Sequence, residues 1–141
     1  MKCFWVVAII FSAVICGCSG DSDKQEIENV ISKFGDAMLE KDLEKLITTI
    51  EDGSELKDQM NGEHFFTGVN FFTFKLIDLD IRKNVATAEL EAELEELVHR
   101  SSEYITLKFM MTLQLKNTKD GWIIYDLSSE LAPGYKRPER P

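Results

Sequence analysis

The chain has 141 residues, of which 44% are hydrophobic and 29% are charged, and its formal net charge at pH 7 is −9. This composition suits a single globular domain, and the acidic balance excludes the basic surface that binding to nucleic acid requires. All three cysteines lie at or before residue 18, so the domain that follows has neither disulfides nor thiolate chemistry.

The N-terminal residues have the layout of a secretory signal. Lys2 precedes an apolar run over residues 4–15, and roughly a dozen residues are too few to span a bilayer. The run ends in Ile15-Cys16-Gly17-Cys18, which resembles the lipobox of bacterial lipoproteins. This resemblance implies that residues 1–17 are a cleaved signal peptide. It also implies that Cys18 carries a diacylglyceryl thioether and usually an N-linked acyl chain such as palmitate.

The same resemblance implies a location in the cell. We expect a chain anchored in the bacterial cell envelope through the lipid on Cys18 rather than through its charge. Ser19 after that cysteine implies the periplasmic face of the outer membrane if the cell is Gram-negative. Residues 18–23 are small and polar, and they predict a short lipidated tether that keeps the domain close to the membrane.

Helical signals follow this tether. Asp23 and Glu26 have the spacing of a capping box, and helical periodicity then predicts a helix over residues 24–40. Its apolar positions are Ile27, Val30, Ile31, Phe34 and Met38. Asp42 can cap a second helix that ends near Gly53. That helix has the inner residues Leu43, Leu46, Ile47 and Ile50, and Leu56 and Met60 indicate a third, short helix before an irregular loop.

From Val69 the apolar residues recur with a period of two, which predicts strands. The first strand alternates through Phe72, Phe74 and Leu76 and then, in the opposite phase, through Ile77, Leu79 and Ile81. This change of phase predicts a bulge near Leu76–Ile77. Arg82-Lys83-Asn84 is a turn into a second strand whose inward residues are Ala86, Ala88, Leu90, Ala92 and Leu94.

Two more strands complete the pattern. The third has the inward residues Ile105, Leu107, Phe109, Met111, Leu113 and Leu115. Asp120-Gly121 predicts a hairpin turn into a last strand over residues 122–127. Helices followed by a meander predict an α+β domain over residues 24–131, with N-terminal helices packed on a strongly curved antiparallel sheet, and a C-terminal tail over residues 132–141.

The layout resembles the nuclear transport factor 2-like superfamily, a cone of helices held in a bent sheet. The matching pieces are the first helix through Phe34 and Met38, Lys41-Asp42-Leu43-Glu44, the hairpin into Ala86-Thr87-Ala88, and Gly121-Trp122-Ile123-Ile124-Tyr125-Asp126-Leu127. A long helix lying across a flat sheet is the alternative fold.

Candidate catalytic residues are isolated. The resemblance implies that enzymes of this superfamily, such as ketosteroid isomerases, polyketide cyclases and dehydratases, hold an acid or base with partners in the cone. The weak candidates here are His64, Asp36 and Tyr104, with Tyr125 as a second hydroxyl. Each has an ordinary explanation as a solvated or packed residue, and His99 as a solvated one, so we assign no catalytic residue.

Metal and cofactor sites are not predicted. No histidine has a second histidine or a cysteine at ligand spacing, and no phosphate-binding or dinucleotide-binding motif is present. One strand carries Glu89, Glu91, Glu93 and Glu95 on the same face. A single strand cannot wrap a Ca²⁺ ion, so we interpret this face as solvated and paired with Lys108, Lys116 and Lys75 of neighbouring strands. Contact with a basic partner is the alternative.

Two functions follow from the sequence. The first is a non-catalytic binding or protein-interaction module of the envelope, with an envelope protein or a small apolar ligand as partner. The alternative is a small-molecule enzyme of the cyclase, isomerase or dehydratase type that uses a pocket in the cone. A homodimer formed through the sheet face and an accessory subunit of an envelope complex are further hypotheses.

Overall fold

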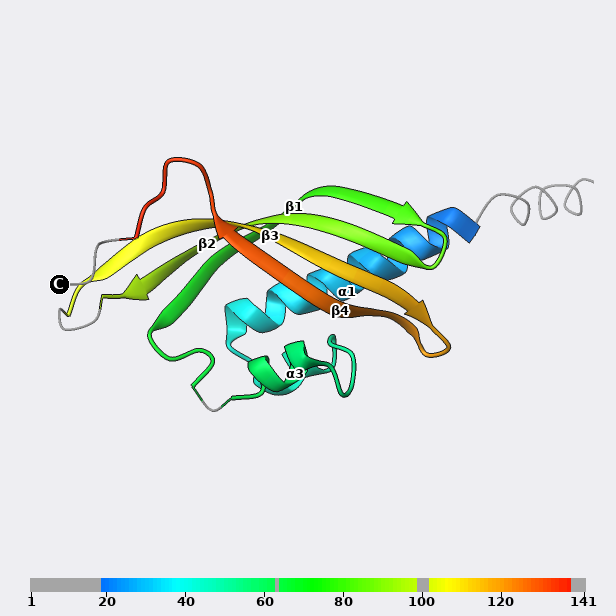
Figure 1. Ribbon diagram of the computed structural model, residues 1–141, viewed down its shortest axis with the longest axis horizontal. Helices are drawn as coiled ribbons and strands as arrows, with labels where there is room; N and C mark the ends of the chain where they lie inside the picture. The colour runs from blue at the N-terminus through cyan, green and yellow to red at the C-terminus, as the bar shows by residue number, and fades with distance from the viewer. Residues whose placement is uncertain (1–18, 63, 99–101, 138–141) are drawn as a thin grey trace, which may run out of the picture.

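The computed structural model describes residues 19–62, 64–98 and 102–137. In these residues the helices α1 (Ser19–Glu40), α2 (Leu43–Ile47) and α3 (Glu55–Met60) precede the strands β1 (Val69–Arg82), β2 (Val85–Leu97), β3 (Tyr104–Thr118) and β4 (Gly121–Leu131). The strands form one antiparallel sheet in the order β1-β2-β3-β4. The sheet arches over α1, and α2 and α3 follow at the C-terminal end of that helix (Figure 1). The predicted α+β fold is confirmed.

The first helix begins earlier than predicted. It is helical from Ser19, the first described residue, so residues 19–23, which we predicted as a tether, form its first turns. Asp23 does not cap a helix start at residue 24. Its Oδ1 instead accepts a hydrogen bond of 3.2 Å from Nε1 of Trp122 at the beginning of β4. This contact, together with Asp21 in the positive end of the helix dipole, favours the longer helix.

The predicted cap at Asp42 and both short helices are present, although α2 ends at Ile47 rather than near Gly53. Asp42 caps α2 by accepting a hydrogen bond of 3.0 Å from the backbone N–H of Lys45. Ser54, for which no cap was predicted, caps α3 by accepting a hydrogen bond of 3.1 Å from the N–H of Lys57. Ile50 lies beyond the end of α2 and forms a bridge with Ile124 of β4. The helical segment is therefore hydrogen-bonded to the edge of the sheet.

Strand β1 contains two irregularities, of which one was predicted. The register shifts between Leu76 and Asp78, as the change of phase indicated. A second shift lies between Phe71 and Thr73, and it reverses the faces of the preceding residues. Phe72 is 51% exposed and Ile77 is 47% exposed, so the predicted grouping of Phe72 with Phe74, and of Ile77 with Leu79, is wrong. Phe71 packs against the core together with Phe74.

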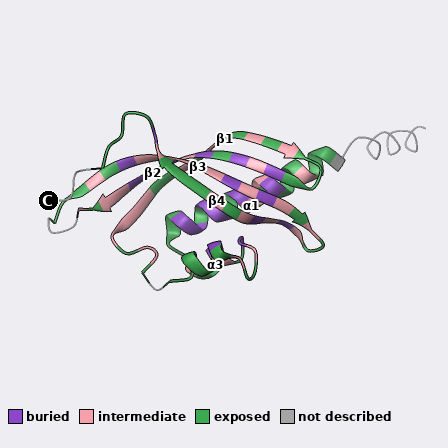
Figure 2. Ribbon diagram, viewed as in Figure 1, coloured by how far each residue is buried: buried purple, intermediate pink, exposed green. Residues whose placement is uncertain are grey.

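The core lies between α1 and the concave face of the sheet (Figure 2). Small residues of β2 are part of this core, since Ala86, Ala88 and Ala92 are each 2% exposed or less. The largest fully buried side chains are those of Phe34, Ile27, Met38, Leu46, Ile50, Leu90, Leu107, Leu113, Leu115 and Ile124. Alternation on β2 and β3 therefore predicted the buried face correctly.

The end of the chain is held against the sheet. β4 extends to Leu131, beyond the predicted end at residue 127, because its C-terminal part pairs with β3 from Phe109 to Leu113. The N–H of Ala132 then donates a hydrogen bond of 2.8 Å to the carbonyl of Lys108. Arg137 lies 3.6 Å from a carboxylate oxygen of Glu96. The described part of the predicted tail therefore contacts β2 and β3.

Candidate ligand-binding groove and acidic sheet face

A groove lies between α1 and β1, and it is lined by one of the three candidate residues, Asp36. It has a volume of ≈ 230 Å³, with Glu28, Ser32, Asp36 and Leu39 of α1 at its sides and Phe74 and Leu76 of β1 across from them. Helical spacing places these four α1 residues on one face of the helix. The groove thus combines an apolar strand wall with two carboxylates.

Gly35 allows the two walls of the groove to meet at its floor. A Cβ at this position would lie 3.3 Å from Cβ of Phe74, so any larger residue would push α1 away from β1. The ring of Phe74 packs edge-on against Phe34 of α1, with centroids 6.1 Å apart. Leu90 of β2, which is 1% exposed, also lines the groove. The floor is therefore closely packed and apolar.

Asp36 has an exposed side chain, and no hydrogen bond or ion pair joins it to any other residue that the structure describes. A general base works best when burial and hydrogen-bonded partners tune its carboxylate. Asp36 has neither in this structure. Its geometry suits attraction of a cationic or polar ligand group at the edge of the groove.

His64 and Tyr104 lie elsewhere. His64 is exposed in the turn between α3 and β1, where its carbonyl accepts a hydrogen bond of 3.0 Å from the N–H of Thr67. Beside it, the rings of Phe65 and Phe66 pack edge-on against each other at 4.8 Å and contact the core. Tyr104 is 50% exposed at the start of β3. No hydrogen bond or ion pair joins any two of Asp36, His64 and Tyr104, all of which the structure describes.

The second tyrosine has a cationic neighbour. Tyr125 of β4 is partly buried, and Nζ of Lys116 lies 5.5 Å from its ring centroid. An ammonium over an aromatic face is a favourable contact. Tyr125 therefore has a packing role that does not depend on a ligand.

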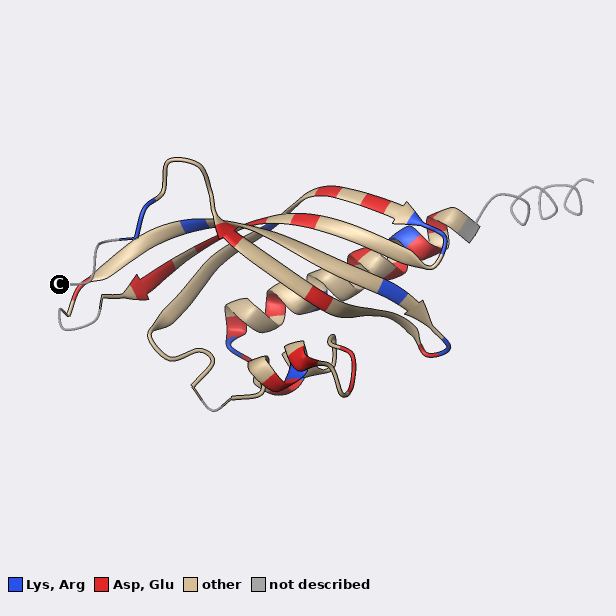
Figure 3. Ribbon diagram, viewed as in Figure 1, with Lys and Arg blue, Asp and Glu red and all other residues tan. Residues whose placement is uncertain are grey.

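β2 carries several acidic residues (Figure 3), and they alternate with its buried residues, so they lie on the face of the sheet away from the core. Nζ of Lys108 on β3 lies 3.4 Å from a carboxylate oxygen of Glu91 and 3.4 Å from one of Glu93. The hydrogen bond with Glu93 raises the pKa of the Lys108 ammonium above its ordinary value of 10.5, and the charge of Glu91 raises it further, while burial opposes both. The predicted cross-strand pairing of Lys108 is confirmed.

The other two lysines are not paired with these glutamates. Lys116 lies opposite Val85 in the register, so no glutamate faces it, and its ammonium pairs with Glu51 from the segment between α2 and α3. Our prediction for Lys116 was therefore wrong. Lys75 lies opposite Glu91, but no ion pair links these two described residues.

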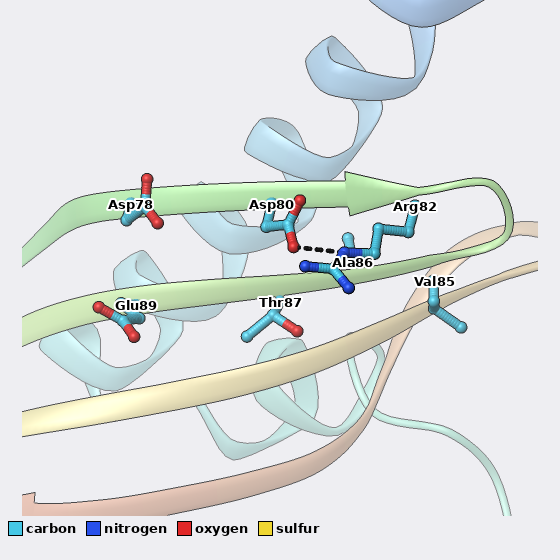
Figure 4. A pocket seen from close by; sticks show the side chains of 7 residues that line it. All are labelled: Asp78, Asp80, Arg82, Val85, Ala86, Thr87 and Glu89. Atoms are coloured by element: carbon cyan, nitrogen blue, oxygen red, sulfur yellow. Dashed lines mark hydrogen bonds and ion pairs between the residues drawn. The ribbon is translucent and has the colours of Figure 1, made fainter.

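A second, open hollow lies on the β1–β2 hairpin (Figure 4). It has a volume of ≈ 460 Å³ and is lined by the side chains of Asp78, Asp80, Arg82, Thr87 and Glu89, among others. Nε of Arg82 donates a hydrogen bond of 2.7 Å to Oδ2 of Asp80. Asp78 and Asp80 alternate in the sequence, but no pattern there predicted a hollow beside them.

The described residues contain no group of three or more His, Cys, Asp or Glu side chains that could hold a metal ion. Cys18 and His99 lie outside the described residues. Within residues 19–62, 64–98 and 102–137, none of the helices has the length and apolar character that crossing a membrane requires.

Comparison with solved structures identifies the fold. The chain is similar to hexachlorocyclohexane dehydrochlorinase from Novosphingobium barchaimii, with a TM-score of 0.65, 8% identity, and coverage of 84% of this chain and 95% of that one. A ketosteroid isomerase-like protein from Erwinia carotovora has a TM-score of 0.64 and 15% identity over 76% of this chain and 94% of its own.

A nuclear transport factor 2-like superfamily protein from Salmonella enterica has a TM-score of 0.61 and 14% identity, and the match covers 84% of this chain and 100% of that one. No protein-family model matches the sequence, and no curated protein matches it. The chain therefore has the nuclear transport factor 2-like fold, and at these identities the likeness concerns the fold alone.

Proposed function

We propose that this chain is a lipid-anchored envelope protein that binds an apolar group in the groove between α1 and β1 and catalyses no reaction there. The observation that carries the binding proposal is the groove itself, in which Phe74 and Leu76 face the acidic side chains of Glu28 and Asp36. The anchor is supported by the sequence Ile15-Cys16-Gly17-Cys18. The fold accommodates both binding proteins and enzymes, so the proposal depends on the groove rather than on the fold.

The size and charge of the groove define the ligand class. A volume of ≈ 230 Å³ is below the ~300–1,000 Å³ of most small-molecule pockets, so one large apolar side chain of a protein partner fits it better than a drug-sized molecule. The carboxylates of Glu28 and Asp36 disfavour an anionic group at the rim and favour a cationic one. An apolar side chain next to a lysine or arginine has the required chemistry.

The binding proposal is tested by filling the groove. Ser32→Trp places a large ring at its edge, and the neighbouring exposed residue Lys33, which does not line the groove, offers the matched control Lys33→Trp. With toluene, a neutral probe of the size of one apolar side chain, we expect Ser32→Trp to weaken binding, followed by NMR titration, about tenfold, which corresponds to about 1.4 kcal/mol. Lys33→Trp should bind as the unchanged protein does. Equal binding by all three proteins would place the probe outside the groove.

The anchor is tested separately. Cys18→Ala should abolish incorporation of radiolabelled fatty acid and release the protein from membranes, because no later residue offers a thiol. Cys16→Ala is the matched control within the same four residues, and it should leave both properties unchanged. Persistent lipid labelling of the Cys18→Ala protein would refute the proposed anchor.

An enzyme of the isomerase or dehydratase type is the second candidate. It is favoured by the similarity to a ketosteroid isomerase-like protein and a dehydrochlorinase, and by Asp36 at the groove. Ketosteroid isomerisation and chloride release from hexachlorocyclohexane are suitable assays. We expect no turnover above the buffer rate. A turnover that Asp36→Asn abolishes, and that Asp42→Asn retains, would replace the binding proposal with the enzyme.

A further inference from the structure

One end of the molecule brings together the start of α1 and the turns of both β-hairpins that flank it, β1–β2 and β3–β4 (Figure 1). We call this the hairpin end and define it by residues 19–23, 82–85 and 118–121. Hydrogen bonds join its three parts. The N–H of Asn117 donates to the carbonyl of Asn84 at 2.8 Å, and Trp122, which lies opposite Asn117 in the register, donates from Nε1 to Asp23. The hairpin end is therefore a single connected surface.

The tip of each turn carries an exposed lysine. Lys83 and Lys119 form no ion pair with any described residue, whereas Arg82 is paired with Asp80. Asp21, Asp23 and Asp120 offset the charges of Arg82, Lys83 and Lys119, so the hairpin end is balanced in charge rather than strongly basic. This balance contrasts with the net charge of −9 of the whole chain, whose acidic residues are spread along the helices and strands (Figure 3). Val85 beside Lys83 adds an apolar side chain that is 46% exposed.

The helix leaves no described linker between this surface and the proposed anchor. Cys18 directly precedes Ser19, and Ser19 is already part of α1. We propose that the hairpin end faces a phospholipid bilayer, with Lys83 and Lys119 contacting lipid phosphates. This inference rests on the proposed lipid anchor at Cys18. The helix then fixes the orientation of the domain, where a flexible tether would leave it free.

The orientation has a consequence for binding. The opposite end of the sheet, where β2 ends and β3 begins, exposes Leu97 and Tyr104 by 41% and 50%. With the hairpin end on the membrane, these two residues lie at the end of the sheet that is farther from it. The Asp36 groove lies along α1 between the two ends and stays accessible from the side.

Site-specific labels can measure this orientation in the complete lipidated protein. The processed chain has no free thiol, because residues 1–17 are removed and the sulfur of Cys18 is in a thioether. Asn84→Cys and Asp120→Cys place a fluorophore at the hairpin end without removing a lysine, and Ser102→Cys places it on the connection between β2 and β3. Vesicles of phosphatidylethanolamine and phosphatidylglycerol carry a nitroxide on the lipid headgroups as quencher. We expect quenching at residues 84 and 120 to be at least threefold greater than at residue 102.

A second pair of variants tests the lysines. Lys83→Gln combined with Lys119→Gln should reduce quenching at residue 120 about twofold on anionic vesicles and leave it unchanged on phosphatidylcholine alone. Lys33→Gln combined with Lys136→Gln removes the same charge elsewhere and should have no effect. Equal quenching at residues 84, 120 and 102 in vesicle-bound protein would overturn the orientation while leaving the anchor intact. Failure of the protein to carry lipid and to bind vesicles would overturn both.

Discussion

At the scale of single residues, Asp23 occupies a position that the local pattern assigns to a helix cap, but it makes a contact with a distant part of the chain. Its spacing from Glu26 predicts a capping box, but its carboxylate accepts the indole N–H of Trp122, 99 residues later. Trp122 is only 6% exposed, so its N–H needs a partner in the folded protein. The contact joins the start of α1 to the start of β4.

We predict that Asp23→Ala lowers the free energy of unfolding by about 1 kcal/mol relative to Asp21→Ala, measured by urea denaturation. Both substitutions remove a carboxylate near the N-terminus of α1 and introduce the better helix former, so their difference isolates the bond to Trp122. Equal stability of the two variants would mean that water replaces the carboxylate at no cost.

Lys108 provides a pH-dependent prediction. Its pKa is raised in the folded protein, so its contribution to stability is fully present below about pH 10.5 and is lost as the pH rises through the higher folded value. Lys108→Gln should therefore be less stable than the unchanged protein at pH 7, and the difference should disappear at strongly alkaline pH. Lys33→Gln, which removes an exposed lysine of α1, should show no such pH dependence. A difference between Lys108→Gln and the unchanged protein that is constant with pH would contradict the role of Glu91 and Glu93.

At the scale of elements, the packing of α1 on β1 depends on one glycine in the helix. A glycine-to-alanine change inside a helix ordinarily stabilises it by up to about 1 kcal/mol. At Gly35 the new Cβ would lie 3.3 Å from Cβ of Phe74, which is closer than ordinary van der Waals contact, and overpacking costs about 1–3 kcal/mol.

We therefore predict that Gly35→Ala lowers the free energy of unfolding by about 1 kcal/mol, measured by urea or thermal unfolding. Gly20→Ala is the control in the same helix, because nothing lies within 4 Å of its added Cβ, and it should be neutral or slightly stabilising. A stabilised Gly35→Ala protein would show that β1 shifts at Phe74 and makes room for the added methyl group.

Strand β1 also shows how far periodicity predicts an element. The change of phase at Leu76–Ile77 is visible in the sequence, because apolar residues stand next to each other there. Phe71 and Phe72 are also adjacent and apolar, but the alternation alone does not tell which of the two faces the core. Pairing with Leu94 of β2 places Phe71 inward and leaves Phe72 exposed, so the second bulge depends on the neighbouring strand.

At the scale of the whole molecule, the candidate site was less predictable than the fold. Asp36 was a candidate from its place on the first helix, but the groove exists only where Gly35 lets α1 approach Phe74. His64 and Tyr104 lie on other elements, and no spacing in the sequence distinguished these two candidates from Asp36, which lines the groove. The orientation proposed for the hairpin end likewise depends on α1 beginning at Ser19 rather than at residue 24.

The sequence by itself determined the order of helices and strands, the cap at Asp42 and the inward faces of β2 and β3, because these depend on local propensity and on the period of the apolar residues. Only the tertiary structure decided the partners of Asp23 and Lys116, the second bulge of β1 and the position of the groove. Each of these depends on which residues meet after the sheet has closed over α1, and such contacts between distant parts of the chain leave no local pattern in the sequence.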